Sequence, residues 1–136
     1  MFEIDVEGRE HAPGAPGDAV VREALQLAFA SAGVHAGHVA IHFVDEERSH
    51  ELAAEYLGKD DATDVISFPV DEDDDLGPDL AANVIRELGD IVICPERTHD
   101  LLEAIVHGAL HLVGMDHEVD DGEMLAVQGE LLGWLR

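Results

Sequence analysis

The sequence predicts an α+β fold, close to the α/β type, in one domain that spans residues 1–136. Segments with the alternating or apolar pattern of strands take turns along the chain with segments that have the 3.6-residue period of helices. The chain has 136 residues and 46% of them are hydrophobic, which is enough to bury a core and is a usual size for one domain. The sequence contains no repeats and no linker-like stretches, so nothing in it favours a second domain.

In the first half of the chain, capping residues mark the helices and alternation marks the strands. Phe2–Val6 alternates apolar and polar residues, as a half-buried strand does. Asp18 and Asp45 are suitable N-caps, and Gly33 and Gly58 are suitable residues at which helices end. The predicted elements are a strand at Phe2–Val6, a helix from Asp18 to about Ala32, a strand at Val39–Val44 and a helix from Asp45 to about Tyr56.

In the second half, two short apolar runs precede two longer helical patterns. The first helix is predicted to be mostly apolar and therefore largely buried. The predicted elements are strands at Val65–Val70 and Asp90–Cys94, a helix from about Thr98 to Val113 and a last helix from about Asp120 to Leu132.

Three histidines, His107, His111 and His117, have the spacing of metal ligands. Residues four apart lie on one face of a helix, one turn from each other, so the first two can bind the same ion. His117 would point about 240° away from His111 in a continued helix. The helix must therefore end between them, and Gly114 suits this because glycine adopts the left-handed C-cap conformation at little cost. Three histidine nitrogens leave a fourth position open, as in catalytic zinc sites.

A single histidine in an apolar stretch is more often a satisfied core or surface residue than a ligand. The triplet is different, because burying His107 and His111 in an apolar helix without a partner is costly. Its spacing matches the zinc-protease pattern H-E-x-x-H-x-x-G-x-x-H except at Gly108, which replaces the glutamate that serves as general base. The remaining histidines lie outside this triplet pattern and are interpreted as surface or core residues: His11, His35, His38, His42, His50 and His99.

The stretch from His107 to His117 resembles the H-G-x-L-H-L-x-G-x-D-H signature of the YbeY family, the bacterial rRNA-maturation endoribonucleases. Thr63–Pro69 resembles the family's T-[ND]-V-L-S-F-P strand, and Leu88–Cys94 resembles its L-G-D-[IL]-V-I-[CS] strand. The likeness runs from about Val39 to the end of the chain, in the same order and at similar spacing. The resemblance implies a small mixed sheet of about four strands packed with about four to five helices, with the Val65–Val70 strand beside the active-site cleft.

The resemblance also implies the residues of an active site. One zinc ion would be held by His107, His111 and His117. Asp116 would orient a ligand histidine or accept a proton. The family often has an arginine in Y-R-G-K-D that is thought to assist cleavage, and that position is Leu57 here. Three explanations remain open. Lys59, the only lysine of the chain, supplies the missing positive charge, or the enzyme is less active without the arginine, or the arginine is not essential for cleavage.

The function that the resemblance implies is a zinc-dependent, single-strand-specific endoribonuclease in 16S rRNA 3′-end maturation and ribosome quality control. Its partners would be single-stranded rRNA and ribosomal particles or ribosomal proteins, and no DNA is expected. Ser67 and Phe68 would line the cleft, with Phe68 stacking on a base or packing in the core. Two alternatives remain: a non-enzymatic, metal-stabilised ribosome-assembly factor, favoured by Leu57, and a zincin-like metalloprotease with a base such as Glu103 or Glu118, disfavoured by Gly108.

The net charge of −24 opposes an RNA-binding function, because phosphate backbones are bound by lysine and arginine. An RNA enzyme of this composition needs its few basic residues gathered at one cleft, or a ribosomal partner that presents the RNA. The basic candidates, besides the metal ion itself, are Arg48, Lys59, Arg86 and Arg97.

A cytoplasmic location is predicted. No apolar run approaches the 18 residues of a membrane span, so no membrane association is expected, and the N-terminal residues lack the pattern of a signal peptide. The single cysteine, Cys94, cannot form an internal disulfide and is predicted to pack as a small apolar residue at a strand end.

Overall fold

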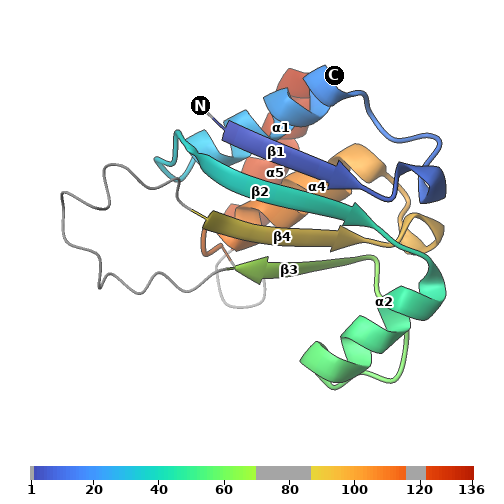
Figure 1. Ribbon diagram of the computed structural model, residues 1–136. Coiled ribbons are helices and arrows are strands. Elements are labelled where there is room, and N and C mark those ends of the chain that lie inside the picture. Colours follow the sequence, from blue (N-terminus) through green and yellow to red (C-terminus); the bar gives the residue numbers. More distant parts are fainter. Residues whose placement is uncertain (1, 70–86, 116–121) are drawn as a thin grey trace.

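A mixed four-stranded sheet lies at the centre of the computed structural model, which describes residues 2–69, 87–115 and 122–136 (Figure 1). The strand order is β1-β2-β4-β3, with β1, β2 and β4 parallel and β3 antiparallel to β4. This arrangement confirms the predicted α+β class and the four-stranded sheet. The strands are β1 (Phe2–Glu7), β2 (Gly37–Phe43), β3 (Val65–Pro69) and β4 (Glu87–Ile93). The helices are α1 (Asp18–Ala30), α2 (Glu46–Leu52), α4 (Leu101–Leu112) and α5 (Glu123–Leu135).

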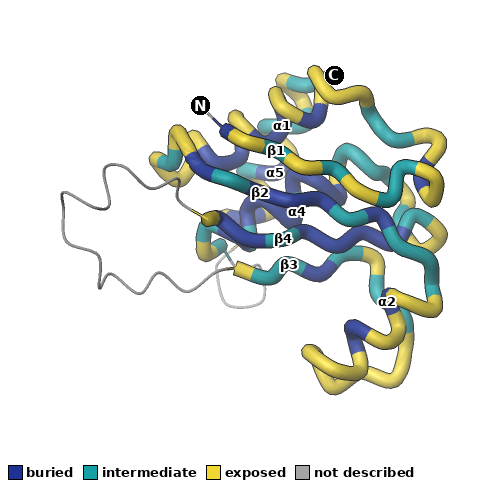
Figure 2. Tube along the Cα trace, in the orientation of Figure 1, coloured by how far each residue is buried: buried dark blue, intermediate teal, exposed yellow. Residues whose placement is uncertain are grey.

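Helices α1, α4 and α5 cover one face of the sheet and enclose the main core with it (Figure 1). On β1, Phe2, Ile4 and Val6 belong to this core, whereas the residues between them point to the other face. The other face, which we call the open face, is covered by described residues near β3 and β4. There Leu52 and Ala53, at the junction of α2 with a π-helical turn (Ala53–Leu57), pack on buried residues of the two strands. Figure 2 shows the resulting exposure along the strands.

Two histidines of β2 bridge carboxylates across the open face. His38 contacts Asp5 (Nε2···Oδ2, 2.6 Å) on β1 and Glu87 (Nδ1···Oε1, 2.8 Å) on β4. Four residues along β2, His42 contacts Glu7 (3.2 Å) and Asp90 (3.0 Å) in the same way. Hydrogen bonds to Asp5 and then to Glu87 raise the pKa of His38 above its ordinary value. The prediction that these histidines are surface or core residues therefore agrees with their positions.

Strand β4 begins at Glu87, three residues before the predicted start at Asp90. The reason is Gly89, which interrupts the apolar pattern and has a φ of +130°. A Cβ atom at Gly89 would lie 2.3 Å from the carbonyl oxygen of Phe68 on β3, so glycine is needed where the two backbones approach closely. Cys94 follows the strand directly and is buried, as predicted, and burial raises the pKa of its thiol.

The predicted N-cap of α1 and the predicted start of α4 were wrong. Gly17, not Asp18, is the N-cap of α1, because the Asp18 carboxylate pairs with Arg9. Helix α4 begins at Leu101 rather than near Thr98, because residues 95–97 form a 3₁₀ turn and the Thr98 hydroxyl donates to the Cys94 carbonyl (2.7 Å). The prediction of Asp45 as an N-cap is confirmed, since its carboxylate accepts from the Arg48 backbone N–H (2.8 Å). Among the helices in the described ranges, none combines the length and apolarity of a membrane span.

Candidate metal centre

Helix α4 carries the first two predicted ligands and is fixed at its start by Asp100. The Asp100 side chain caps the helix by accepting from the Glu103 backbone N–H (3.2 Å) and also pairs with Arg136 at the chain terminus. Burial alone would raise the pKa of the Asp100 carboxyl, but the hydrogen bonds from Arg136 and Glu103 outweigh burial and hold it below its ordinary value. The start of the ligand helix is thus tied to the end of α5.

Gly108 lets α4 approach the sheet. A Cβ atom at this position would lie 2.5 Å from Cγ2 of Ile91 on β4 and 3.3 Å from Oγ of Ser67 on β3. The Ser67 hydroxyl instead donates to the Gly108 carbonyl (3.0 Å). The side chain of any other residue here would therefore point at the sheet. The zinc-protease pattern has a glutamate at position 108, and its side chain would here point into Ile91 of the sheet instead of into the cleft.

His107 and His111 face each other along α4. Their Nε2 atoms are 3.1 Å apart and their rings lie at 73° to one another. Both side chains are half-buried. The helical spacing therefore brings the Nε2 atoms of the two imidazoles close together on one face of α4, as the sequence predicts.

A glutamine on α5 orients His107. The Gln128 side-chain oxygen lies 2.8 Å from Nδ1 of His107, and the Gln128 amide nitrogen donates to Oε1 of Glu103 (3.3 Å). A carboxylate only accepts hydrogen bonds, so Glu103 requires the amide NH₂ to face it, and the amide oxygen then faces the histidine. Nδ1 of His107 must carry the proton, which leaves the lone pair of Nε2 directed at His111. The tautomer that binds a metal through Nε2 is the one this contact selects.

Gly114 ends α4 as the sequence predicts. Its φ is +94°, its N–H donates to the His111 carbonyl (3.0 Å) and the N–H of Met115 donates to the Leu110 carbonyl (3.1 Å). These two bonds form a Schellman motif, which turns the chain away from the helix axis. The third predicted ligand, His117, and the predicted catalytic Asp116 lie outside the described residues.

The histidine pair opens into a cleft of about 550 Å³ between α4, β3 and the segment that follows α2. Lys59 lines this cleft together with Leu57 and Asp64. The predicted catalytic lysine and the two predicted ligands thus share one cavity, and the leucine in the arginine position is beside them. Strand β3 borders the cleft, as predicted. The described residues that line it are Leu57, Lys59, Thr63, Asp64, Val65, Ile66, Ser67, Pro69, His107 and His111.

Two of the four basic candidates lie away from this cleft. Arg48 lines a different cavity on the open face, and Arg97 pairs with Glu46 (3.2 Å) and Asp61 (3.3 Å). Arg86 lies outside the described residues. Lys59 is therefore the basic residue that the described cleft contains, and a bound metal ion would be its main positive charge.

The structure places Ser67 in this cleft and supports the second of the two alternatives for Phe68, packing in the core. Successive side chains of a strand point to opposite faces. Ser67 faces α4, whereas Phe68 packs against the small cluster on the open face and lines the cavity there.

The donor set fits zinc. A tetrahedral zinc ion with Zn–N distances of about 2.1 Å holds two ligand nitrogens roughly 3.4 Å apart. The two Nε2 atoms, 3.1 Å apart, are within a few tenths of an ångström of that separation. The Gln128 carboxamide accepts from the ring nitrogen of His107 that does not face the ion, as hydrogen-bond acceptors do for ligand histidines in metal sites. Gln128 was not predicted from the sequence, although a glutamine on the buried side of an apolar helix is an available signal.

The fold and this site define the class of protein: a single α+β domain with a histidine pair of α4 in a cleft beside β3, an edge strand of the mixed sheet. Residues 9–135 match the family model described as Endoribonuclease YbeY, and the chain belongs to this family. The match extends the likeness seen from Val39 onward to nearly the whole chain.

Individual relatives agree with the family match. The chain is 38% identical to Endoribonuclease YbeY of Bacillus cytotoxicus, over 84% of this chain and 83% of the relative. It is 41% identical to that of Acinetobacter baylyi, over 71% and 69%, and 38% identical to that of Pseudomonas entomophila, over 99% and 90%. The solution structure of TM1509 from Thermotoga maritima is similar, with a TM-score of 0.54 and 25% identity over 98% of this chain and 89% of that one.

Proposed function

We propose that this chain is a zinc-dependent endoribonuclease that cleaves single-stranded rRNA. The observation that carries the proposal is the pair of Nε2 atoms of His107 and His111, 3.1 Å apart at the wall of a cleft, in a chain whose relatives are endoribonucleases by name. The proposed step is hydrolysis in 16S rRNA 3′-end maturation, with a part in ribosome quality control.

Each residue of the cleft has a separate proposed role. His107, His111 and His117 would hold the ion, and Gln128 keeps His107 in the tautomer that can do so. Zinc held there would supply Lewis acidity and an activated water near neutral pH. Lys59 would bind a phosphate oxygen beside the scissile bond, since it lines the same cleft. Asp116 would orient a ligand or accept a proton.

The acidic composition favours presentation of the RNA by a partner. With a net charge of −24 and Asp64 in the cleft wall, the protein has little electrostatic attraction for a free RNA strand. We propose that ribosomal particles, through their rRNA or a ribosomal protein, bring the single strand to the cleft, and that this occurs in the cytoplasm.

One alternative has an observation in its favour. Leu57 lines the cleft at the position where the family often has an arginine, so a metal-stabilised assembly factor without cleavage activity is the second candidate. A metalloprotease is less compatible with the site, because residue 108 faces the sheet and Glu103 is bonded to Gln128.

Cleavage of a defined substrate tests the proposal. Zinc-loaded protein is incubated with a single-stranded fragment of the 16S rRNA 3′ end, alone and in ribosomal particles, with His107→Ala as the inactive variant. The proposal predicts cleavage that a chelator and His107→Ala both abolish. Normal binding to particles without any cleavage would favour the assembly factor, and cleavage unchanged in His107→Ala would identify a contaminating nuclease.

A further inference from the structure

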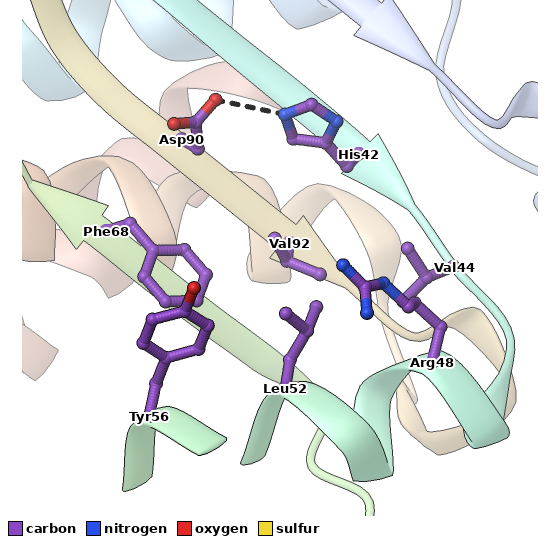
Figure 3. Close-up of a pocket in the computed structure, with 8 residues that line it drawn as sticks. All are labelled: His42, Val44, Arg48, Leu52, Tyr56, Phe68, Asp90 and Val92. Atoms are coloured by element: carbon purple, nitrogen blue, oxygen red, sulfur yellow. Dashed lines mark hydrogen bonds and ion pairs between the residues drawn. The ribbon is translucent and has the colours of Figure 1, made fainter. Parts of the chain in front are cut away.

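A second cavity of about 500 Å³ lies on the open face of the sheet, on the other side of β3 from the histidine pair. We call it the open-face groove. Its volume is in the usual range of small-molecule sites, and its mixture of apolar walls with a few polar groups is typical of them. Figure 3 shows the side chains that line it: His42, Val44, Arg48, Leu52, Tyr56, Phe68, Asp90 and Val92.

One wall of the groove is a pair of aromatic rings. Tyr56 packs edge-on against Phe68, with ring centroids 5.0 Å apart and planes at 75°. Phe68 is held by the small apolar cluster that includes Leu52 and Val92, so it fixes the orientation of the tyrosine. Tyr56 nevertheless remains 58% exposed. A ring held in place with much of its surface in solvent is suited to stacking on a nucleobase, because every base has a π face.

The rim of the groove carries polar groups that match the edge of a base. Arg48 on α2 pairs with Glu51 (3.2 Å), but both side chains are more than half exposed, so the pair contributes little and can exchange for a ligand. On β4, Asp90, which is the register partner of Phe68, accepts from His42 through one oxygen (3.0 Å). Arginine binds acceptors on bases and phosphates, and a carboxylate accepts from base amino groups.

The groove and the metal cleft share two segments of chain. On β3, Ser67 lines the cleft and the next residue, Phe68, lines the groove. After α2, Tyr56 lines the groove and the next residue, Leu57, lines the cleft. Because β3 is an edge strand of the sheet, a chain that lies in the cleft can reach the groove by passing over this one strand.

The charges of the open face favour a base over a basic peptide. Carboxylates of the strands lie there, which would attract a cationic partner, but four of them already contact a histidine of β2, namely Asp5, Glu7, Glu87 and Asp90. They would also repel phosphates, so the backbone of an RNA strand must stay on the side of Arg48 and Lys59 while the base enters the groove.

We propose that the open-face groove binds one nucleobase of the single-stranded RNA, from a nucleotide that flanks the scissile bond. Tyr56 stacks on the base, Arg48 contacts its edge or its phosphate, and Asp90 accepts from its amino group. This inference rests on the proposed endoribonuclease function, because that function brings a single strand to the neighbouring cleft.

Binding of a labelled oligonucleotide measures the contribution of Tyr56. The probe is a fluorescein-labelled, single-stranded octaribonucleotide of mixed sequence with 2′-O-methyl riboses that resist cleavage, titrated with zinc-loaded protein at low salt, and binding is followed by anisotropy. Tyr56→Ala is expected to weaken binding about fivefold to a hundredfold, the range for loss of one base stack. Tyr56→Phe keeps the ring and is expected to bind like wild type. Trp134→Ala removes another exposed aromatic, 72% exposed on α5, and is the matched control.

The position of the base is tested by crosslinking. A 4-thiouridine octanucleotide is irradiated on the protein, and the crosslinked peptide is identified by mass spectrometry. The proposal predicts crosslinks to the peptide that contains Tyr56 or Phe68. Unchanged affinity in Tyr56→Ala with a native melting curve overturns it, as do crosslinks confined to other peptides. Binding of a lysine-rich, phenylalanine-containing peptide that displaces the RNA probe and is lost in Tyr56→Ala would make the groove a polypeptide site and overturn it as well.

The outcome is separable from the cleavage test. If zinc-loaded wild type cleaves RNA and Tyr56→Ala has an unchanged KM, the groove proposal fails while the nuclease stands. If wild type does not cleave RNA, the endoribonuclease proposal fails, and the anisotropy and crosslinking results still decide whether the groove holds a base.

Discussion

Replacing Gln128 with leucine removes the acceptor that fixes His107 while keeping a side chain of similar size on α5. The bond that is lost is short, 2.8 Å from the amide oxygen to Nδ1, and Gln128 is only 7% exposed. Without it, Nδ1–H must be buried unsatisfied or the proton must move to Nε2, where it blocks the metal. Leaving a buried donor unsatisfied costs about 1–3 kcal/mol. Substitution of a residue that hydrogen-bonds to a metal-ligating histidine weakens metal binding about 10- to 100-fold, which is roughly 1.4–2.7 kcal/mol. The cost of the unsatisfied donor and the expected loss of metal-binding free energy therefore have the same magnitude.

The assay is competition for zinc with a chromogenic chelator, together with the nitrogen chemical shifts of His107 in metal-free protein. Gln128→Leu is expected to bind zinc 10- to 100-fold more weakly and to lose the fixed Nδ1–H tautomer. Gln26→Leu is the matched control, because Gln26 is an exposed glutamine on α1. A zinc affinity within twofold of wild type in a folded Gln128→Leu protein would refute the orienting role of Gln128.

Three further substitutions test the fold around the site. Gly108→Ala places a Cβ atom 2.5 Å from the Ile91 side chain and is expected to lower the free energy of unfolding by about 1–3 kcal/mol in urea titrations; no loss would mean that α4 does not lie this close to the sheet. His38 has a raised pKa, so it stabilises the fold below about pH 6.5 and loses that contribution as the pH rises through the raised value. His38→Asn should therefore cost more stability at about pH 5.5 than at about pH 8.5, whereas exposed His99→Asn should cost the same at both, and a pH-independent His38 effect would contradict the bridge. Asp100→Ala removes the α4 cap and is expected to cost about 1 kcal/mol, seen as a lower Tm; an unchanged Tm would show that the cap contributes nothing.

The sequence predicts the parts of the site that depend on local geometry. His107 and His111 meet because residues four apart in a helix always share a face, and Gly114 turns the chain because its φ is positive. These rules need no knowledge of the rest of the fold. The helix N-cap at Asp45 was found for the same reason.

The parts that depend on packing between distant segments could not be found in this way. Gln128 reaches His107 only because α5 packs on α4, and no spacing rule connects residues so far apart. The close approach of Gly89 to Phe68 likewise comes from strand pairing, which the residues around Gly89 do not show by themselves. For Phe68, strand alternation alone decides between the two alternatives, because it places Phe68 on the opposite face from Ser67.

Zinc content of the purified chain is the most direct test of the metal centre on which the proposed activity depends. Elemental analysis, with circular dichroism as a check of folding, is made on wild type, His111→Ala and His99→Ala. The account predicts one zinc ion per chain in wild type and in His99→Ala, and a large loss in His111→Ala. Substoichiometric zinc in wild type that does not fall further in His111→Ala would contradict it.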